Sequence, residues 1–177
     1  MLAARTTLAA FLAVLLASCA QLERAAPEQP VFELHARLAA RYRNESFSGA
    51  VAWQHGRDSD EMLITSPLGA GVARIVREGD AVTLTTAEPR EYKARDAEAL
   101  TEEVLGFRLP LAGLADWVRG QAADAPHPIQ TFADGRLKTL EQGGWKIEYQ
   151  AYEGERPSRL RLLYPGIELR LAISEWK

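Results

Sequence analysis

The stretch at residues 167–176, IELRLAISEW, alternates between apolar and polar side chains along its length. A period of two is typical of a β-strand with one face buried and one face in water, because successive side chains of a strand point to opposite sides. The apolar set is Ile167, Leu169, Leu171 and Ile173, and the polar set is Glu168, Arg170 and Ser174. The stretch therefore predicts a half-buried strand.

The same period recurs along most of the chain. Near the start, Leu34, Ala36, Leu38 and Ala40 oppose His35, Arg37 and Arg41. Further alternating runs are EMLIT, GVARIV, AVTLTT, RLKTLEQ, WKIEYQAY and SRLRLLY, and the connections GRDSD, EGD, ADG, GG and PG have the composition of tight turns. An antiparallel meander of this many strands curls instead of staying flat. We expect a curved antiparallel sheet with one apolar face and one wet face.

Two short amphipathic segments interrupt the strand pattern. Asp96 is a suitable N-cap for AEALTEEVLG, which ends at Gly106. The segment LPLAGLADWVRG has apolar residues at helical spacing and ends at Gly120. Both segments are predicted helices that cover the apolar face of the sheet, either as a packed core or as a lid over a cavity.

The N-terminal segment has the layout of a secretory signal. Residues 1–18 contain Arg5 and then an apolar run that is too short to span a bilayer. The following LLASCA resembles the lipobox of bacterial lipoproteins, in which Cys19 is acylated and becomes the new N-terminus. An ordinary signal cut after Ala20 is the alternative. We expect a covalent lipid on Cys19, a palmitate-type acyl anchor, and no other cofactor.

Residues 19–30 contain two prolines and few apolar side chains, which is typical of a tether. Residues 31–177 have the size of one domain, with no internal repeat. Ala20 after the cysteine resembles the pattern of lipoproteins sorted to the outer membrane, with the body facing the periplasm of a Gram-negative bacterium. The formal charge of −3 becomes −4 when the segment that carries Arg5 is removed, which argues against a nucleic-acid partner. A monomer is expected.

Catalytic and metal-binding patterns are not found in the sequence. His35, His55 and His127 do not stand at metal-ligand spacing, and we expect each of them to be solvated. Glu102 and Glu103 are expected on the solvent face of the first helix. No nucleophile motif or phosphate-binding loop is present. The sequence therefore predicts no catalytic residue, no metal site and no enzyme activity.

One turn carries an unusual residue. In SPLG, Leu68 stands between Pro67 and Gly69, where polar side chains are common. A leucine there either folds back into the core or contacts something other than water. Composition and alternation leave these two alternatives open.

Several segments together resemble a known family. They are FELHARLAARYRNESFSGAVAWQH, MLITSPLG, GFRLPLAGLADWVRG, GGWKIEYQAY and the final ISEW, in this order after a lipobox and a tether. This combination looks like the LolB family of outer-membrane lipoprotein receptors. Two departures are Ser66, where asparagine is as readily expected, and the short tether.

The resemblance implies an unclosed β-barrel with a helical lid over an apolar cavity, the fold of the periplasmic carrier LolA. It also implies a receptor that accepts the acyl chains of lipoprotein cargo from LolA and releases them into the inner leaflet of the outer membrane. Two alternatives remain: a structural or assembly lipoprotein with a filled core that acts as a docking module, and a lipid-acting hydrolase.

Alternation assigns apolar side chains to the cavity of such a fold. On the sheet they are Leu38, Val51, Trp53, Leu63, Val72, Trp145, Ile147, Tyr149, Leu160, Leu162, Leu169, Leu171 and Ile173, and on the lid Leu105, Leu109, Leu114, Trp117 and Val118. The resemblance further implies that Leu68 is the exposed residue of a protruding loop that acts in membrane delivery.

Overall fold

The computed structural model describes residues 29–88, 90–105, 108–124 and 126–177, with the backbone alone at Leu105 and Ala112. The signal segment and nearly all of the tether, including Cys19, lie outside these residues. Within them, the elements in chain order are β1 (Phe32–Tyr42), β2 (Glu45–His55), β3 (Ser59–Thr65), β4 (Gly71–Glu78), β5 (Ala81–Thr86), β6 (Glu91–Ala94), α2 (Ala97–Leu105), α3 (Leu111–Val118), β7 (Ile129–Ala133), β8 (Arg136–Gln142), β9 (Trp145–Glu153), β10 (Arg156–Tyr164) and β11 (Ile167–Trp176).

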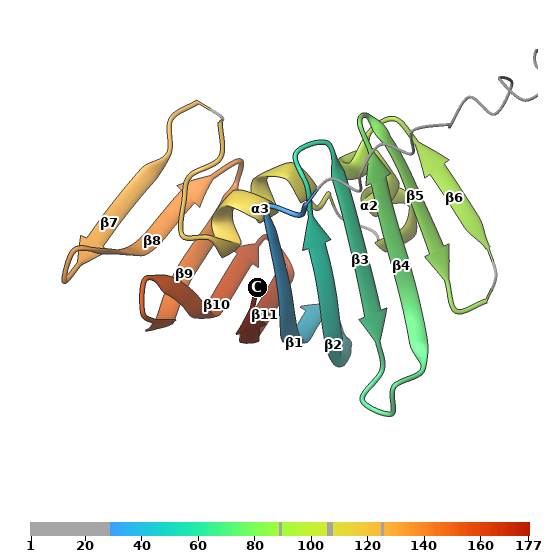
Figure 1. Cartoon of the computed structure of the whole chain (residues 1–177), viewed down its shortest axis with the longest axis horizontal. Coiled ribbons are helices and arrows are strands. Elements are labelled where there is room, and N and C mark those ends of the chain that lie inside the picture. The colour runs from blue at the N-terminus through green and yellow to red at the C-terminus, as the bar shows by residue number, and fades with distance from the viewer. Residues whose placement is uncertain (1–28, 89, 106–107, 125) are drawn as a thin grey trace, which may run out of the picture.

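The described strands form one antiparallel sheet in the order β6-β5-β4-β3-β2-β1-β11-β10-β9-β8-β7. It consists of two meanders joined side by side where β1 pairs with β11. The sheet curves strongly, and its edges β6 and β7 lie far apart (Figure 1). The expected unclosed, curved antiparallel sheet is confirmed.

Alternation explains which side chains face inward. In β1, Phe32, Leu34 and Ala36 are each at most 3% exposed, whereas the alternate residues His35 and Arg37 are exposed. β11 shows the same pattern, with Ile167, Leu169, Leu171 and Ile173 buried, so β1 and β11 bury the sets that alternation predicts.

Both helices lie on the concave side of the sheet (Figure 1). Asp96 caps α2 as expected, because its Oδ1 atom accepts hydrogen bonds from the backbone N–H groups of Glu98 at 2.9 Å and Ala99 at 3.3 Å. The helix α2 packs against β5 and β6. After α3, Gly120 adopts a φ of +77°, a conformation that favours glycine and ends the helix.

The hydrophobic core forms between the concave face and these helices. All buried apolar residues of the described chain lie between Phe32 and Ile173. All described strands lie between Phe32 and Trp176. A chain that starts at residue 20 therefore carries the whole sheet and its core, and we expect it to fold without the residues before it.

Candidate functional site

An apolar cavity of about 370 Å³ lies on the concave side of the sheet, between the central strands and α3. Its volume falls within the range of about 300–1,000 Å³ found for small-molecule sites. Ten of the residues predicted from the sequence line it: Leu38, Val51, Trp53, Val72, Leu109, Leu114, Val118, Leu169, Leu171 and Ile173. The structure therefore brings these side chains from both meanders and from the α3 region around one space.

Further lining residues were missed by the sequence analysis, although most stand at alternating positions of their strands. They include Leu34, Ala40, Tyr42, Phe47, Met62, Ile64, Ala73 and Ile75. Strict alternation from Leu34 and from Phe47 would have found the four that belong to β1 and β2.

Six residues predicted for the cavity belong instead to the packed core beside it. Trp117, Trp145, Ile147, Tyr149, Leu160 and Leu162 are at most 2% exposed and do not line the cavity. The reason is the large side chain of Trp117, which fills the space between α3 and the second meander and contacts the ring of Trp145 at a centroid distance of 6.2 Å.

Hydrogen bonds hold Trp117 in this position. Its Nε1–H group donates to Oε1 of Gln142 at 3.0 Å, and its carbonyl oxygen accepts a bond from the hydroxyl of Tyr149 at 2.9 Å. Burial, with a smaller contribution from Tyr152, raises the pKa of Tyr149, so its hydroxyl remains a donor. The second meander is therefore closed by a filled core, and the open volume lies at the first meander and β11.

The prediction for Leu63 is wrong. Its side chain is 41% exposed and lies on the convex face. Met62, Leu63 and Ile64 are three consecutive apolar residues, so alternation alone does not fix which of them point inward. Strand pairing determines that Met62 and Ile64 point inward, because Met62 stands opposite the buried Trp53 and Ile64 opposite the buried Val51.

One end of the cavity carries the polar residues of its lining. Glu45 and Ser46, which follow the turn between β1 and β2, stand there. The turn between β3 and β4 lies at the same end of the sheet (Figure 1). The cavity therefore reaches toward the end of the molecule where the SPLG turn stands.

The SPLG turn holds Leu68 away from the protein. The backbone N–H of Gly69 donates to the carbonyl oxygen of Ser66 at 2.9 Å, and Ser66 also bonds Ala70 through both its backbone and its hydroxyl group. Gly69 has a φ of +85°, which glycine adopts without strain. The side chain of Leu68 is 97% exposed. Of the two alternatives left open by the sequence, the structure favours the exposed one.

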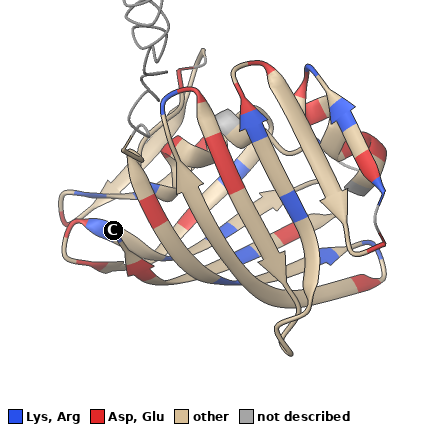
Figure 2. Cartoon of the chain, turned by 45° about the vertical axis from the view of Figure 1, so that its right-hand side comes forward, with Lys and Arg blue, Asp and Glu red and all other residues tan. Residues whose placement is uncertain are grey.

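The tip of the β3–β4 hairpin, which carries Leu68, projects beyond its neighbours, and residues 62–73 contain no acidic or basic side chain (Figure 2). An exposed leucine on an uncharged projection has no contact in the described chain that would explain it.

A buried ionic cluster stands at the opposite end of β3. Asp60 is 4% exposed and accepts hydrogen bonds from Trp53 at 2.8 Å and from Arg77 at 2.6 Å, while Nδ1 of His55 lies 2.7 Å from its Oδ1. Burial would raise the pKa of Asp60, but the hydrogen bonds from His55, Trp53 and Arg77 outweigh it and hold the pKa below the ordinary 3.8. The cluster ties together β2, β3 and β4.

This cluster corrects the expectation for His55. The side chain of His55 is 12% exposed and paired with Asp60, and so it is not a solvated residue. His35 and His127 are exposed, as expected. Within the described ranges, no three histidine, cysteine, aspartate or glutamate side chains gather as a metal site.

Other predictions fall outside what the structure describes. Cys19 and nearly all of the tether precede the first described residue, and the side chain of Leu105 is not described.

Glu102 and Glu103 are exposed on α2, as expected, and Glu102 forms an ion pair with Arg108 at 3.2 Å. In the part of the chain that is described, no helix has the length and apolar character that a membrane crossing requires.

Comparison with known proteins decides the family. The model of the family "Outer membrane lipoprotein LolB" matches residues 30–176, which is most of the chain and all of the described sheet. The chain belongs to the LolB family. Proteins named outer-membrane lipoprotein LolB are 39% identical to it in Thiobacillus denitrificans, over 85% of this chain and 82% of the relative, and 40% identical in Nitrosomonas europaea, over 82% and 72%.

A third LolB relative, from Pseudomonas aeruginosa, is 36% identical over 85% of this chain and 76% of its own length. Among solved structures, a LolA superfamily protein from Nitrosomonas europaea has a similar fold, with a TM-score of 0.53 over 86% of this chain and 87% of that chain. At 11% identity this likeness concerns the fold alone. LolB-family membership makes this protein a member of a family of outer-membrane lipoproteins, and not of a known family of enzymes.

Proposed function

We propose that this LolB-family protein is an outer-membrane lipoprotein receptor. It accepts the acyl chains of lipoproteins from a LolA-type periplasmic carrier into the apolar cavity and releases them into the inner leaflet of the outer membrane. The observation that carries the proposal is the cavity itself, which is walled by leucine, isoleucine, valine and tryptophan side chains from the sheet and the α3 region.

The energetics explain why a cavity is needed. Each methylene group removed from water contributes about 0.8 kcal/mol, so an acyl chain does not cross water at a useful rate. Transfer between two apolar cavities in contact avoids that cost. A bilayer then binds the chains more strongly than the cavity does, which makes release the favourable direction without nucleotide hydrolysis.

The lipid on Cys19 and the exposed Leu68 complete the proposed cycle. The acylated Cys19 holds the protein at the periplasmic side of the outer membrane, where stable anchoring requires more than one acyl chain. Leu68 inserts into that membrane beside the polar end of the cavity, where the cargo leaves.

A transfer assay tests the proposal. The soluble chain 20–177 is mixed with a LolA-type carrier loaded with a labelled lipoprotein, and the label is followed from one protein to the other. Leu38→Gln places an amide in the cavity wall and is expected to lower acceptance. Val31→Gln is the matched control, because Val31 is 48% exposed and outside the cavity.

The outcome separates the alternatives from the sequence analysis. Transfer to the wild type and the control, but less to Leu38→Gln, supports the receptor. A folded chain that accepts no label would indicate a docking lipoprotein, and a cleaved lipid product would indicate a hydrolase.

A further inference from the structure

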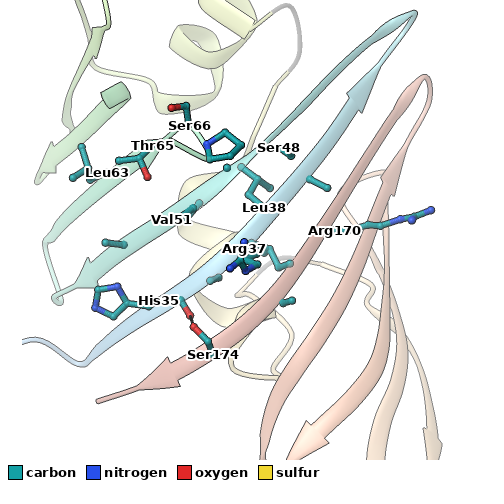
Figure 3. Close-up of a pocket in the computed structure, with 18 of the residues that line it drawn as sticks. His35, Arg37, Leu38, Ser48, Val51, Leu63, Thr65, Ser66, Arg170 and Ser174 are labelled. Carbon is teal, nitrogen blue, oxygen red and sulfur yellow. Dashed lines mark hydrogen bonds between the residues drawn. The ribbon is translucent and has the colours of Figure 1, made fainter. Parts of the chain in front are cut away.

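A second hollow, of about 910 Å³, lies on the convex face of the sheet, on the side of β1, β2, β3, β10 and β11 that faces away from the cavity. The basic residues Arg37, Arg159 and Arg170 line it together with His35, and no aspartate or glutamate is among the described residues that do so. Figure 3 shows Arg37 and Arg170 on neighbouring strands, and Ser48, Thr65, Ser66 and Ser174 also line the hollow. In a chain with a net charge of −3, this is a locally positive surface.

Strand pairing places the arginines around a small residue. Ala172 of β11 stands directly opposite Arg37 of β1 on one side and Arg159 of β10 on the other. Because neighbouring strands are about 4.8 Å apart, the backbones of Arg37 and Arg159 are separated by about 10 Å. Arg170 precedes Ala172 by two residues and therefore points to the same face. The alanine leaves room above the sheet for an anion between these side chains.

The charges of two of these arginines are not neutralised by the protein. Among the described residues, no carboxylate lies within ion-pair distance of Arg37 or Arg159. Arg170, in contrast, donates to Glu168 at 2.6 Å, and Glu168 also accepts a bond from Arg161 at 2.7 Å. These hydrogen bonds lower the pKa of Glu168 to about 2, so this carboxylate is already satisfied.

The hollow is continuous with the SPLG turn. Ser66, Pro67 and Gly69 form part of its wall, and Leu63, an exposed leucine, lies on its surface. Basic side chains beside an exposed apolar tip are typical of proteins that lie on an anionic membrane, where the tip enters the apolar layer and the cations contact phosphate groups. This continuity favours a lipid surface over a soluble acidic partner.

We propose that the convex hollow binds the phosphate groups of anionic phospholipids through Arg37 and Arg159, with Arg170 and the hydroxyl groups of Ser48 and Ser66 beside them. Such binding orients the molecule on the bilayer with Leu68 directed into it. The proposal rests on the proposed delivery into a membrane, but the arginines that it concerns do not line the cavity, and they act without cargo.

Vesicle binding tests the proposal. The soluble chain 20–177, without cargo or carrier, is sedimented with vesicles of phosphatidylcholine alone and of phosphatidylcholine mixed with phosphatidylglycerol. Each basic side chain at an anionic surface contributes about fivefold to binding, so the double variant Arg37→Gln/Arg159→Gln should lower the partition coefficient on the mixed vesicles about 25-fold. It should change binding to phosphatidylcholine little, and added salt should weaken the wild type toward the variant.

The matched control is Arg57→Gln/Arg95→Gln, which removes the same charge from two exposed arginines outside the hollow. Equal losses in both double variants would mean a general charge effect and would overturn the proposal, as would unchanged binding of the Arg37/Arg159 variant. Binding of inorganic phosphate alone at the two arginines, without binding to anionic vesicles, would assign the hollow to a soluble anion and overturn the lipid proposal.

Acceptance of labelled cargo from the carrier is measured on the same variants. Normal acceptance with lost vesicle binding supports the inference. Normal acceptance with unchanged vesicle binding contradicts the inference and leaves the proposed receptor function standing. Failure of acceptance in the wild type contradicts the receptor function, whatever the vesicles show.

Discussion

Replacing Leu68 with glutamate separates folding from membrane delivery. The side chain is 97% exposed, so its removal loses almost no buried apolar area, and the free energy of unfolding should change by no more than about 0.5 kcal/mol. Full burial of a leucine in an apolar phase is worth about 1.5–3 kcal/mol, so a Leu68 that enters the bilayer contributes about 10- to 150-fold to membrane partition. Leu68→Glu should lose that factor and add the cost of a charge at the membrane.

The assay has two steps, measured on the same protein. Acceptance from the carrier is followed in solution, and delivery is followed after addition of liposomes, with thermal unfolding measured alongside. Acceptance and stability should match the wild type while delivery falls. Ile129→Glu is the control, because Ile129 is 62% exposed on the edge strand β7, far from the turn. Normal delivery by Leu68→Glu, or a loss of several kcal/mol in stability, would refute the reasoning.

The other predictions concern the core, the ionic cluster and the base of the turn. Leu160→Ala should cost about 2–5 kcal/mol in denaturant unfolding, because Leu160 is 0% exposed in the packed core, whereas Leu38→Ala in the cavity wall should cost about 1 kcal/mol. Asp60→Asn should cost about 3 kcal/mol at neutral pH, since it leaves buried partners uncompensated. The wild type should lose this stability advantage over Asp60→Asn as the pH falls below 3.8, because the pKa of its Asp60 is lowered in the folded state. Measuring the free energy of unfolding of both proteins against pH checks the sign. Gly49→Ala should lower the melting temperature, because a Cβ atom there would overlap the carbonyl oxygen of Thr65.

Local patterns predicted the elements well, because alternation and capping act between neighbours in sequence. The cap at Asp96 and the inward set of β1 are examples, and both are confirmed. The exposure of Leu68 was left open, because the sequence does not show whether a turn folds back on the core. The hydrogen bonds of Ser66 with Gly69 and Ala70 fix the turn in the conformation that leaves Leu68 exposed.

Alternation does not distinguish the residues that line the cavity from those of the packed core. Both kinds of residue face inward, and only the place where α3 lies distinguishes them. Trp117 fills the second meander through contacts with residues more than twenty positions away, such as Gln142 and Tyr149. The pairing of His55 with Asp60 also depends on contacts beyond the strand itself. His55 stands at a strand end, where a solvated side chain is the usual expectation, but the buried carboxylate of Asp60 lies across the turn and pairs with it.

The pairing of β1 with β11 has a consequence for how the protein matures. Every other neighbouring pair of strands is formed by segments that follow one another, so each hairpin assembles locally, whereas this pair joins the first and last strands of the sheet and requires the longest loop closure. The cavity takes Val51 and Trp53 from one meander and Leu169 and Leu171 from the other. A chain in which β11 has not yet paired with β1 therefore lacks one wall of this volume, and the cavity that we propose to hold lipid forms only in the last step of assembly.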